Sequence, residues 1–268
     1  MRYPWNLDYW KSGEWQAVNE KLHDMEKTGV RYNPIRRNLF ASLTSVQAPE
    51  HVRCCIVGQD PYPDHRMATG LAFSIPPEFK RDSFPPTLRE FFGEYSRDLG
   101  YPIPDHGDLS SWAKQGVLLW NAIPSLTDGR SLSHDWPEYE HLNREVFRLL
   151  DQKGIVFALL GSVARRYQDA IVNSKVIVTS HPSPRGNMNS RTPFKGSRLF
   201  STINAHLNSI GLDPIDWRLP DEPSNQKGLP RTGMDGSNLL PNITGIELGG
   251  LQGRAKRNLY KPNFELQP

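Results

Sequence analysis

The chain has 268 residues, of which 37% are hydrophobic, and its 32 Lys and Arg residues exceed its 29 Asp and Glu residues by three. This length provides for one large domain or two small ones, and the hydrophobic content excludes a chain that is disordered throughout. The only two cysteines, Cys54 and Cys55, are adjacent, which excludes a disulfide framework, a four-cysteine zinc site and an iron–sulfur cluster. No apolar run approaches the roughly 18 residues of a membrane helix, and the first residues lack the apolar core of a signal peptide. We therefore expect an intracellular protein with no membrane partner.

Short apolar runs alternate with helical periodicity between residues 50 and 220. Four runs are typical of buried parallel strands, and they cover residues 53–57, 117–120, 155–160 and 176–179. Helical spacing of apolar residues lies near residues 86–99, 138–152, 162–173 and 196–211. This alternation predicts an α/β fold in a single domain, with a central four-stranded, mostly parallel sheet flanked by helices on both faces.

The chain changes character after residue 220. Residues 221–268 are rich in Gly and Pro and show weak hydrophobic periodicity, which predicts an extended or partly disordered tail after a globular domain over residues 1–220. Within that domain, residues 170–212 contain no Asp or Glu but carry five Lys and Arg side chains. This segment is either a contact surface for a polyanion or a solvated loop that happens to be basic.

Polar side chains follow each predicted strand at its carboxyl end. Asp60 follows the first strand, Asn121 the second, Ser162 the third and His181 the fourth. Ligands of open α/β sheets bind at this edge, so we expect these four side chains to converge on one rim. Their types are suited to catalysis or to recognition of a polar ligand.

Six motifs occur in the order that is typical of the first-family uracil-DNA glycosylases. They are GQDPYP at 58–63, GLAFS at 70–74, PPTLRE at 85–90, HGDLSSWAKQGVLLWNA at 106–122, LLGS at 159–162 and HPSP at 181–184. The chain resembles this family over roughly residues 40–218. The resemblance implies that residues 1–220 form a catalytic domain, which hydrolyses the N-glycosidic bond of uracil in DNA. Free uracil and an abasic site are the products, as in base-excision repair, and no metal or other cofactor is implied.

The resemblance assigns chemistry to Asp60 and His181. Breaking the bond leaves positive charge on the sugar and negative charge on the departing uracil. Asp60 would orient the attacking water and face the sugar cation, while a neutral His181 would donate to uracil O2 as negative charge builds there. Outside these motifs, Asp60 would be read as a turn cap and His181 as a structural loop residue.

Four further residues are expected to bind uracil. The amide of Asn121 would match the O4 and N3–H edge of the base and disfavour cytosine. Phe73 would stack on the base, with an ordinary core position as the alternative. Tyr62 would fill the space beside C5 and exclude the methyl group of thymine. The backbone around Gln59 is expected to contact the base as well.

The target base must leave the DNA stack, and members of the family pinch the phosphate backbone with loops of small residues. The residues matching these loops are Pro86, Thr87, Gly161, Ser162 and Ser183. A hydroxyl at Thr87 stands where the family usually has Ser.

The chain departs from the family after the HPSP motif. The family continues with Leu-Ser, and that Leu fills the hole left by the flipped base, but this chain has Arg185 and Gly186. Either a stacking Arg185 or an adaptable apolar Met188 is the expected wedge, or Arg185 only binds phosphate.

The expected partner is uracil-containing DNA, single- or double-stranded, bound by a monomer. A proteinaceous uracil-glycosylase inhibitor or a replication protein is a second expected class of partner. The alternative function is a glycosylase-fold DNA-binding or replication-scaffold protein with little catalysis, but such a scaffold has no need for Asp60, Asn121 and His181 together. The expected location is the cytoplasm or nucleoid of a bacterium, or the host cell interior for a viral protein.

Overall fold

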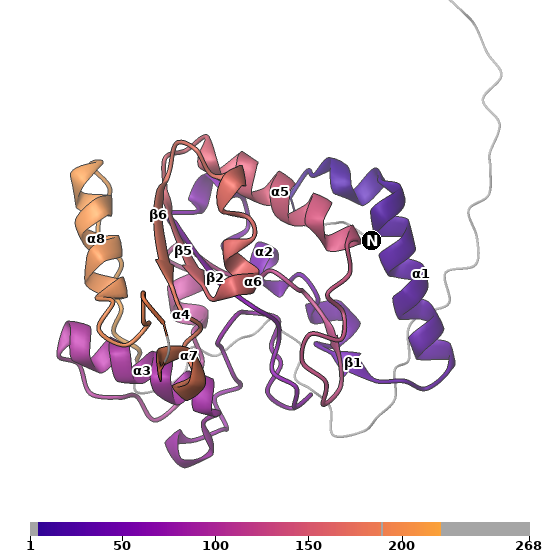
Figure 1. Ribbon diagram of the computed structural model, residues 1–268, viewed down its shortest axis with the longest axis horizontal. Coiled ribbons are helices and arrows are strands. Elements are labelled where there is room, and N and C mark those ends of the chain that lie inside the picture. Colours follow the sequence, from indigo (N-terminus) through magenta and orange to yellow (C-terminus); the bar gives the residue numbers. More distant parts are fainter. Residues whose placement is uncertain (1–4, 189, 221–268) are drawn as a thin grey trace, which may run out of the picture. The chain divides into compact units, whose positions relative to one another are not determined.

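The structure is a computed structural model that describes residues 5–188 and 190–220 (Figure 1). All described residues belong to one compact unit. The expected tail over residues 221–268 lies outside the described residues. The domain boundary after residue 220 therefore stays a prediction.

Four parallel strands form the central sheet, as predicted. Their spatial order is β3 (Val117–Asn121), β2 (Cys54–Gly58), β5 (Val156–Leu160) and β6 (Lys175–Thr179). Each predicted strand end lies within one residue of the observed end. Every residue of β2, β3 and β5 is buried, which explains their unbroken apolar runs, whereas β6 at the edge is more exposed.

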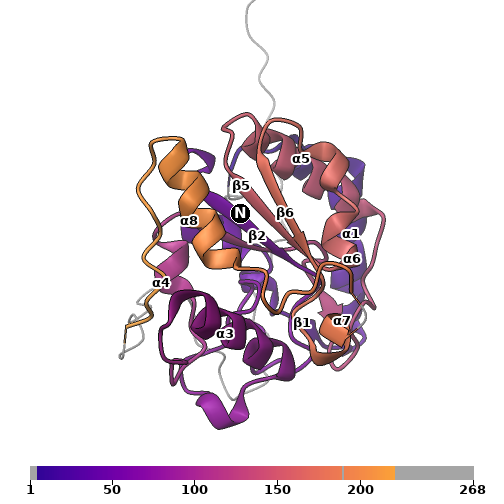
Figure 2. The ribbon, with the colours of Figure 1, turned by 60° about the vertical axis from the view of Figure 1, so that its left-hand side comes forward.

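Helices cover both faces of this sheet, as predicted (Figures 1 and 2). α1 (Gly13–Lys27) and α5 (Glu138–Asp151) pack on one face, and α3 (Pro86–Leu99) and α8 (Leu199–Ser209) pack on the other. The two faces enclose separate cores, because successive strand residues point to opposite sides.

Strand β2 illustrates this alternation. Cys55 and Val57 belong to the core beneath α1 and α5, whereas Cys54 and Ile56 belong to the core beneath α3 and α8. Both cysteines are free and buried, and burial raises the pKa of the Cys54 thiol to about 12. They therefore serve as small apolar core residues.

The sequence of helix α3 explains where the helix begins, where it ends and which face it buries. A proline occupies its first position, where the missing N–H costs nothing, and Gly100 ends it in the left-handed conformation with φ 71°. Leu88, Phe91, Phe92 and Tyr95 recur at the spacing of one helical face, and all four are buried.

The helix predicted near residues 162–173 is shorter than expected. α6 covers Ser162–Arg165, and a 3₁₀ helix, η5, follows at Gln168–Ala170. Apolar residues at helical spacing indicated one continuous helix. However, the carboxylate of Asp151 accepts backbone N–H groups from residues 172–174 and fixes the chain in a different course toward β6.

Several elements were not predicted because they are short or carry few apolar residues. Even the 15-residue α1 buries only Val18 and Leu22 in full. The remaining short elements are α2 (Ala41–Val46), α4 (Ser110–Ala113), α7 (Pro184–Met188), β1 (Tyr32–Asn33), β4 (Leu126–Thr127), η1 (Asp8–Lys11), η2 (Arg36–Asn38), η3 (Pro49–His51) and η4 (Arg81–Ser83).

The antiparallel pair of β1 and β4 supports the loop that follows β2. The side-chain amide of Asn33 donates to the carbonyl of Pro63 at 2.7 Å and to Asp128 Oδ1 at 2.9 Å. This buried amide thereby ties the GQDPYP loop to the segment after β4.

Candidate active site

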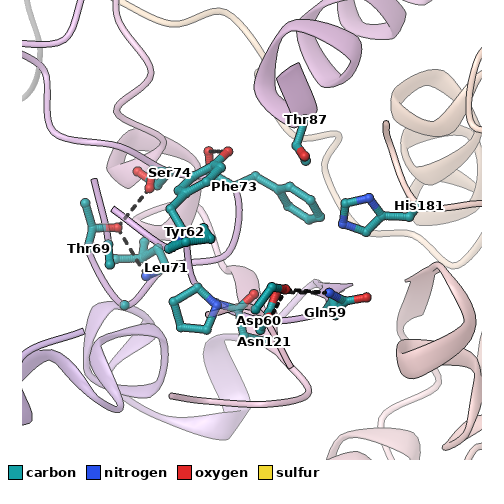
Figure 3. A pocket seen from close by; sticks show the side chains of 15 residues that line it. Gln59, Asp60, Tyr62, Thr69, Leu71, Phe73, Ser74, Thr87, Asn121 and His181 are labelled. Carbon is teal, nitrogen blue, oxygen red and sulfur yellow. Dashed lines mark hydrogen bonds between the residues drawn. The ribbon is translucent and has the colours of Figure 1, made fainter. Parts of the chain in front are cut away.

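A cavity of about 200 Å³ opens at the carboxyl end of the sheet (Figure 3). Seven residues singled out in the sequence line it: Gln59, Asp60, Tyr62, Phe73, Thr87, Asn121 and His181. They come from the ends of β2, β3 and β6, from the loop after β2 and from the start of α3. Ser162, the fourth residue expected on this rim, is not among the lining residues.

Asp60 is held by three donors. Gln59 Nε2 donates to Oδ1 at 3.1 Å, and Oδ2 accepts from Ser131 Oγ at 2.6 Å and from the Leu132 N–H at 2.7 Å. These three hydrogen bonds hold the Asp60 carboxylate in one orientation. The arrangement presents an oriented anion at the pocket wall (Figure 3).

His181 lies two residues after β6, across the pocket from Asp60 (Figure 3). Its carbonyl accepts from the Ser183 N–H at 2.8 Å. Gly161 lies close beside it, since a Cβ added at Gly161 would lie 3.1 Å from the Cβ of His181. Burial lowers the pKa of the imidazole below its ordinary value, and the nearby charge of Asp60 opposes that shift. The imidazole is therefore neutral at pH 7 and offers an uncharged donor.

Asn121 ends β3 and pairs in register with Gly58, which ends β2. Its side chain is 7% exposed, and within residues 5–188 and 190–220 no hydrogen bond to its amide is found. A buried amide normally has partners, so this one is free to bind a ligand edge that both donates and accepts.

Phe73 lies between the core and the pocket. One core neighbour, Phe91, stacks on its ring with centroids 4.8 Å apart and planes 13° apart, while the ring also lines the pocket. Its main chain is in the left-handed region at φ 65°, an unusual conformation for an aromatic residue. Tyr62 OH donates to its carbonyl at 3.2 Å, so the two aromatic residues are fixed together.

The residues expected to contact the DNA backbone lie at three element starts. Pro86 and Thr87 begin α3, Gly161 and Ser162 lie at the start of α6, and Ser183 precedes α7. Thr87 also lines the pocket near His181 (Figure 3). The N–H groups of Gly161 and Ser183 already donate within the chain, to the carbonyls of Thr179 at 2.9 Å and His181 at 2.8 Å, and Pro86 has no N–H.

A short helix, α7, occupies the segment that departs from the family. Arg185 and Met188 are one helical turn apart, and both are exposed, Met188 by 80%. Neither side chain has a described role in the core, so both remain candidates for the wedge.

Asn187, which the sequence did not single out, braces α7. Its Nδ2 donates to Glu90 of α3 at 2.9 Å, and its Oδ1 accepts from the Lys195 N–H at 3.0 Å. Ser180 accepts from the Phe194 N–H at 3.0 Å, which ties the same segment to the residue before His181. An Asn in an irregular loop gives no signal in a single sequence that it bridges two elements.

Ser131 and Leu132 were also missed. Both belong to the segment after β4, outside every motif, and Ser131 lines the pocket beside Asp60. Only the folded chain brings this segment to Asp60, 71 residues away in sequence.

Other sites are not evident in the described part of the chain. Among residues 5–188 and 190–220, no group of three or more His, Cys, Asp or Glu side chains is arranged to hold a metal ion. The helices of the same residues include none with the length and hydropathy of a membrane span.

Comparison with known proteins decides the family. A model of the uracil DNA glycosylase superfamily matches residues 45–208. The chain belongs to this superfamily. The resemblance inferred from the motifs is thereby confirmed.

Bacterial relatives support the assignment over most of the chain. The uracil-DNA glycosylase of Thermobifida fusca is 40% identical over 72% of this chain and 82% of its own length. That of Bacillus velezensis is 41% identical over 82% of this chain and 96% of its own length. The chain is accordingly a hydrolase of N-glycosyl bonds that removes uracil from DNA in base-excision repair.

Solved structures agree on the fold. The mimivirus uracil-DNA glycosylase is 24% identical, has a TM-score of 0.71 and covers 79% of this chain and 85% of its own. A mimivirus UNG variant in complex with UGI superposes with a TM-score of 0.72 at 24% identity, covering 79% of this chain and 86% of its own.

Proposed function

We propose that Asp60 and His181 divide the chemistry of uracil release between them. The oriented carboxylate of Asp60 directs a water to the sugar carbon and stabilises the positive charge that develops there. The neutral imidazole of His181 donates to uracil O2 as the base departs with negative charge. Burial, which lowers the pKa of His181, supports this role because a neutral donor avoids a buried cation beside the base.

We propose that Asn121, Tyr62, Phe73 and Gln59 select uracil. The unpaired amide of Asn121 matches O4 and N3–H of uracil, whereas cytosine presents the inverted pattern. Phe73 supplies a stacking surface, and the ring of Tyr62 occupies the space that a thymine methyl would need. The backbone of Gln59 completes the wall of the pocket.

The proposed substrate is uracil-containing DNA in both single- and double-stranded form. Pro86, Thr87, Gly161, Ser162 and Ser183 would approach the phosphates around the flipped nucleotide. The basic side chains of the acid-free segment are exposed, which supports binding of a polyanion that weakens as salt rises.

The observation that carries this proposal is the shared pocket of Asp60, Asn121 and His181. The test incubates the full chain with a uracil-containing oligonucleotide without added metal and then cleaves abasic sites with alkali. We expect strand cleavage at the uracil position and none with the matched thymine oligonucleotide. In the same assay, Asp60→Asn and His181→Ala should each lower the cleavage rate far more than the affinity for DNA, and equal losses of rate and affinity would refute the proposed roles.

Three further proposals concern the oligomeric state, the protein partners and the location of the chain. We propose a monomer, because the described residues of one chain suffice to bring Asp60, Asn121 and His181 into a shared pocket. The complex of the mimivirus protein with UGI motivates a protein inhibitor as a second class of partner, with a replication protein as a third. The bacterial origin of the relatives favours the cytoplasm or nucleoid as the location.

A further inference from the structure

We propose that Ser131 is a positioning residue for Asp60. Because Ser131 occupies an acceptor position on Oδ2, the free acceptor position of the carboxylate lies on Oδ1. This inference rests on the proposed role of Asp60. Ser131 lies outside the six motifs and is 71 residues from Asp60 in the sequence.

The first support is a closed triangle of side chains. Ser131 Oγ donates to Asp60 Oδ2 at 2.6 Å and accepts from Gln59 Nε2 at 3.2 Å, and the same Nε2 donates to Asp60 Oδ1 at 3.1 Å. The Ser131 hydroxyl has one proton, which it donates to Asp60. The Gln59 amide has two N–H protons, one donated to Ser131 and the other to Asp60. Each group therefore fixes the other two.

The second support is the backbone beside Ser131. Leu132 has φ 63°, and its N–H donates to Asp60 Oδ2 at 2.7 Å. The left-handed conformation costs a side chain such as Leu free energy, and such strain persists where the surrounding structure enforces it. Here the strained turn delivers a second donor to the oxygen that already binds Ser131.

The third support is the anchoring of the loop over residues 128–134. At one end, the Gly129 N–H donates to the carbonyl of Pro63 at 2.9 Å, within the loop that carries Asp60. At the other end, His134 is 2% exposed, with Nδ1 2.8 Å from Ser125 Oγ and Nε2 3.1 Å from Thr127 Oγ1. The loop is therefore a fixed support and not a free surface turn.

The three hydrogen bonds to the Asp60 carboxylate leave one of its acceptor positions free. An ionised carboxylate has about four, two on each oxygen. Oδ2 accepts from Ser131 and Leu132, and among the residues that the structure describes Oδ1 accepts from Gln59 alone. The position that remains is on Oδ1, and it is there that the attacking water would donate its hydrogen bond.

The test compares Ser131→Ala, Ser131→Thr and wild type in single-turnover cleavage of uracil DNA. Loss of one charge-assisted hydrogen bond predicts that Ser131→Ala lowers the maximal rate about tenfold, while the Kd for DNA with uncleavable 2′-fluorodeoxyuridine is unchanged. Ser131→Thr keeps the hydroxyl and should restore most of the rate.

Two controls make the outcome decisive. Ser209→Ala removes an exposed serine hydroxyl near the end of α8 and should leave rate and Kd unchanged. A Ser131→Ala rate within about twofold of wild type, or a loss explained by weaker DNA binding, would overturn the inference. Asp60→Asn separates the two hypotheses. If it is as active as wild type, the proposed role of Asp60 fails; if it is inactive while Ser131→Ala keeps a rate within about twofold of wild type, only this inference fails.

Discussion

Gly58 and Asn121 face each other in register at the ends of two neighbouring parallel strands, and the absence of a side chain at Gly58 makes room for the Asn121 amide. A Cβ at Gly58 would lie 3.0 Å from Asn121 Oδ1 and 3.0 Å from Phe73 Cζ. Contacts this short require the neighbours to shift, and both neighbours line the pocket.

Gly58→Ala is therefore expected to displace the uracil-binding groups. We expect a decrease in kcat/KM for uracil DNA on the order of tenfold, because small displacements of positioning groups are costly in catalysis. Gly93→Ala, at a helical position where a Cβ would meet nothing within 4 Å, is the matched control and should retain activity. Equal kinetics for the two variants would show that the close packing at Gly58 is irrelevant to the site.

Tyr62→Ala should widen the choice of base. Removing the ring opens the space proposed to exclude the methyl group of thymine, so the preference for uracil over thymine should narrow by about tenfold or more. Tyr62→Phe keeps the ring and removes only the hydroxyl that donates to Phe73, so it should still reject thymine. Cleavage of paired uracil and thymine oligonucleotides measures the ratio, and an unchanged ratio in Tyr62→Ala would remove Tyr62 from the specificity mechanism.

Substitutions in α7 test whether Arg185 or Met188 fills the hole that the flipped base leaves in the duplex. Arg185→Ala or Met188→Ala should reduce cleavage of double-stranded uracil DNA about tenfold more than cleavage of single-stranded DNA, since only the duplex has a hole to fill. Val172→Ala is the matched control, because Val172 is 81% exposed and precedes the opposite end of β6. If both α7 variants lose single- and double-stranded activity alike, neither residue is the wedge.

The sequence predicted the sheet well because its central strands are buried on both faces. A run such as Val156–Leu160 has no amphipathic helical pattern to compete with the strand interpretation. Helix α1 was missed for the opposite reason, since it packs through few apolar residues. The segment after Ser162 was overextended because local spacing carries no information about Asp151, which redirects the chain.

For the site, as for the fold, some features could be predicted from the sequence and others could not. Asp60, Asn121 and His181 follow strands, so their shared edge could be predicted from topology. Ser131 and Asn187 act through tertiary hydrogen bonds to Asp60 and Glu90, and nothing in their local sequence marks them. Side chains that support a site from irregular loops require the folded structure.

Buried His134 predicts a pH dependence of stability. Burial lowers its pKa to about 4, so between pH 6.5 and 4 the unfolded chain binds a proton that the folded chain does not. The free energy of unfolding should therefore fall with decreasing pH in this window, by about 3 kcal/mol from this group. His134→Asn should lack this part of the slope in urea unfolding at pH 7 and pH 4.5, and parallel slopes for the two proteins would contradict the assignment.

Asp60 is proposed to act on the reacting centre and not on DNA affinity. Single-turnover cleavage of uracil DNA by Asp60→Asn, measured beside the Kd of the variant for the same DNA, separates these two effects. We expect a rate at least about 100-fold below wild type with a Kd within about threefold of the wild-type value. A variant that keeps the wild-type rate, or loses rate and affinity to the same extent, would contradict it.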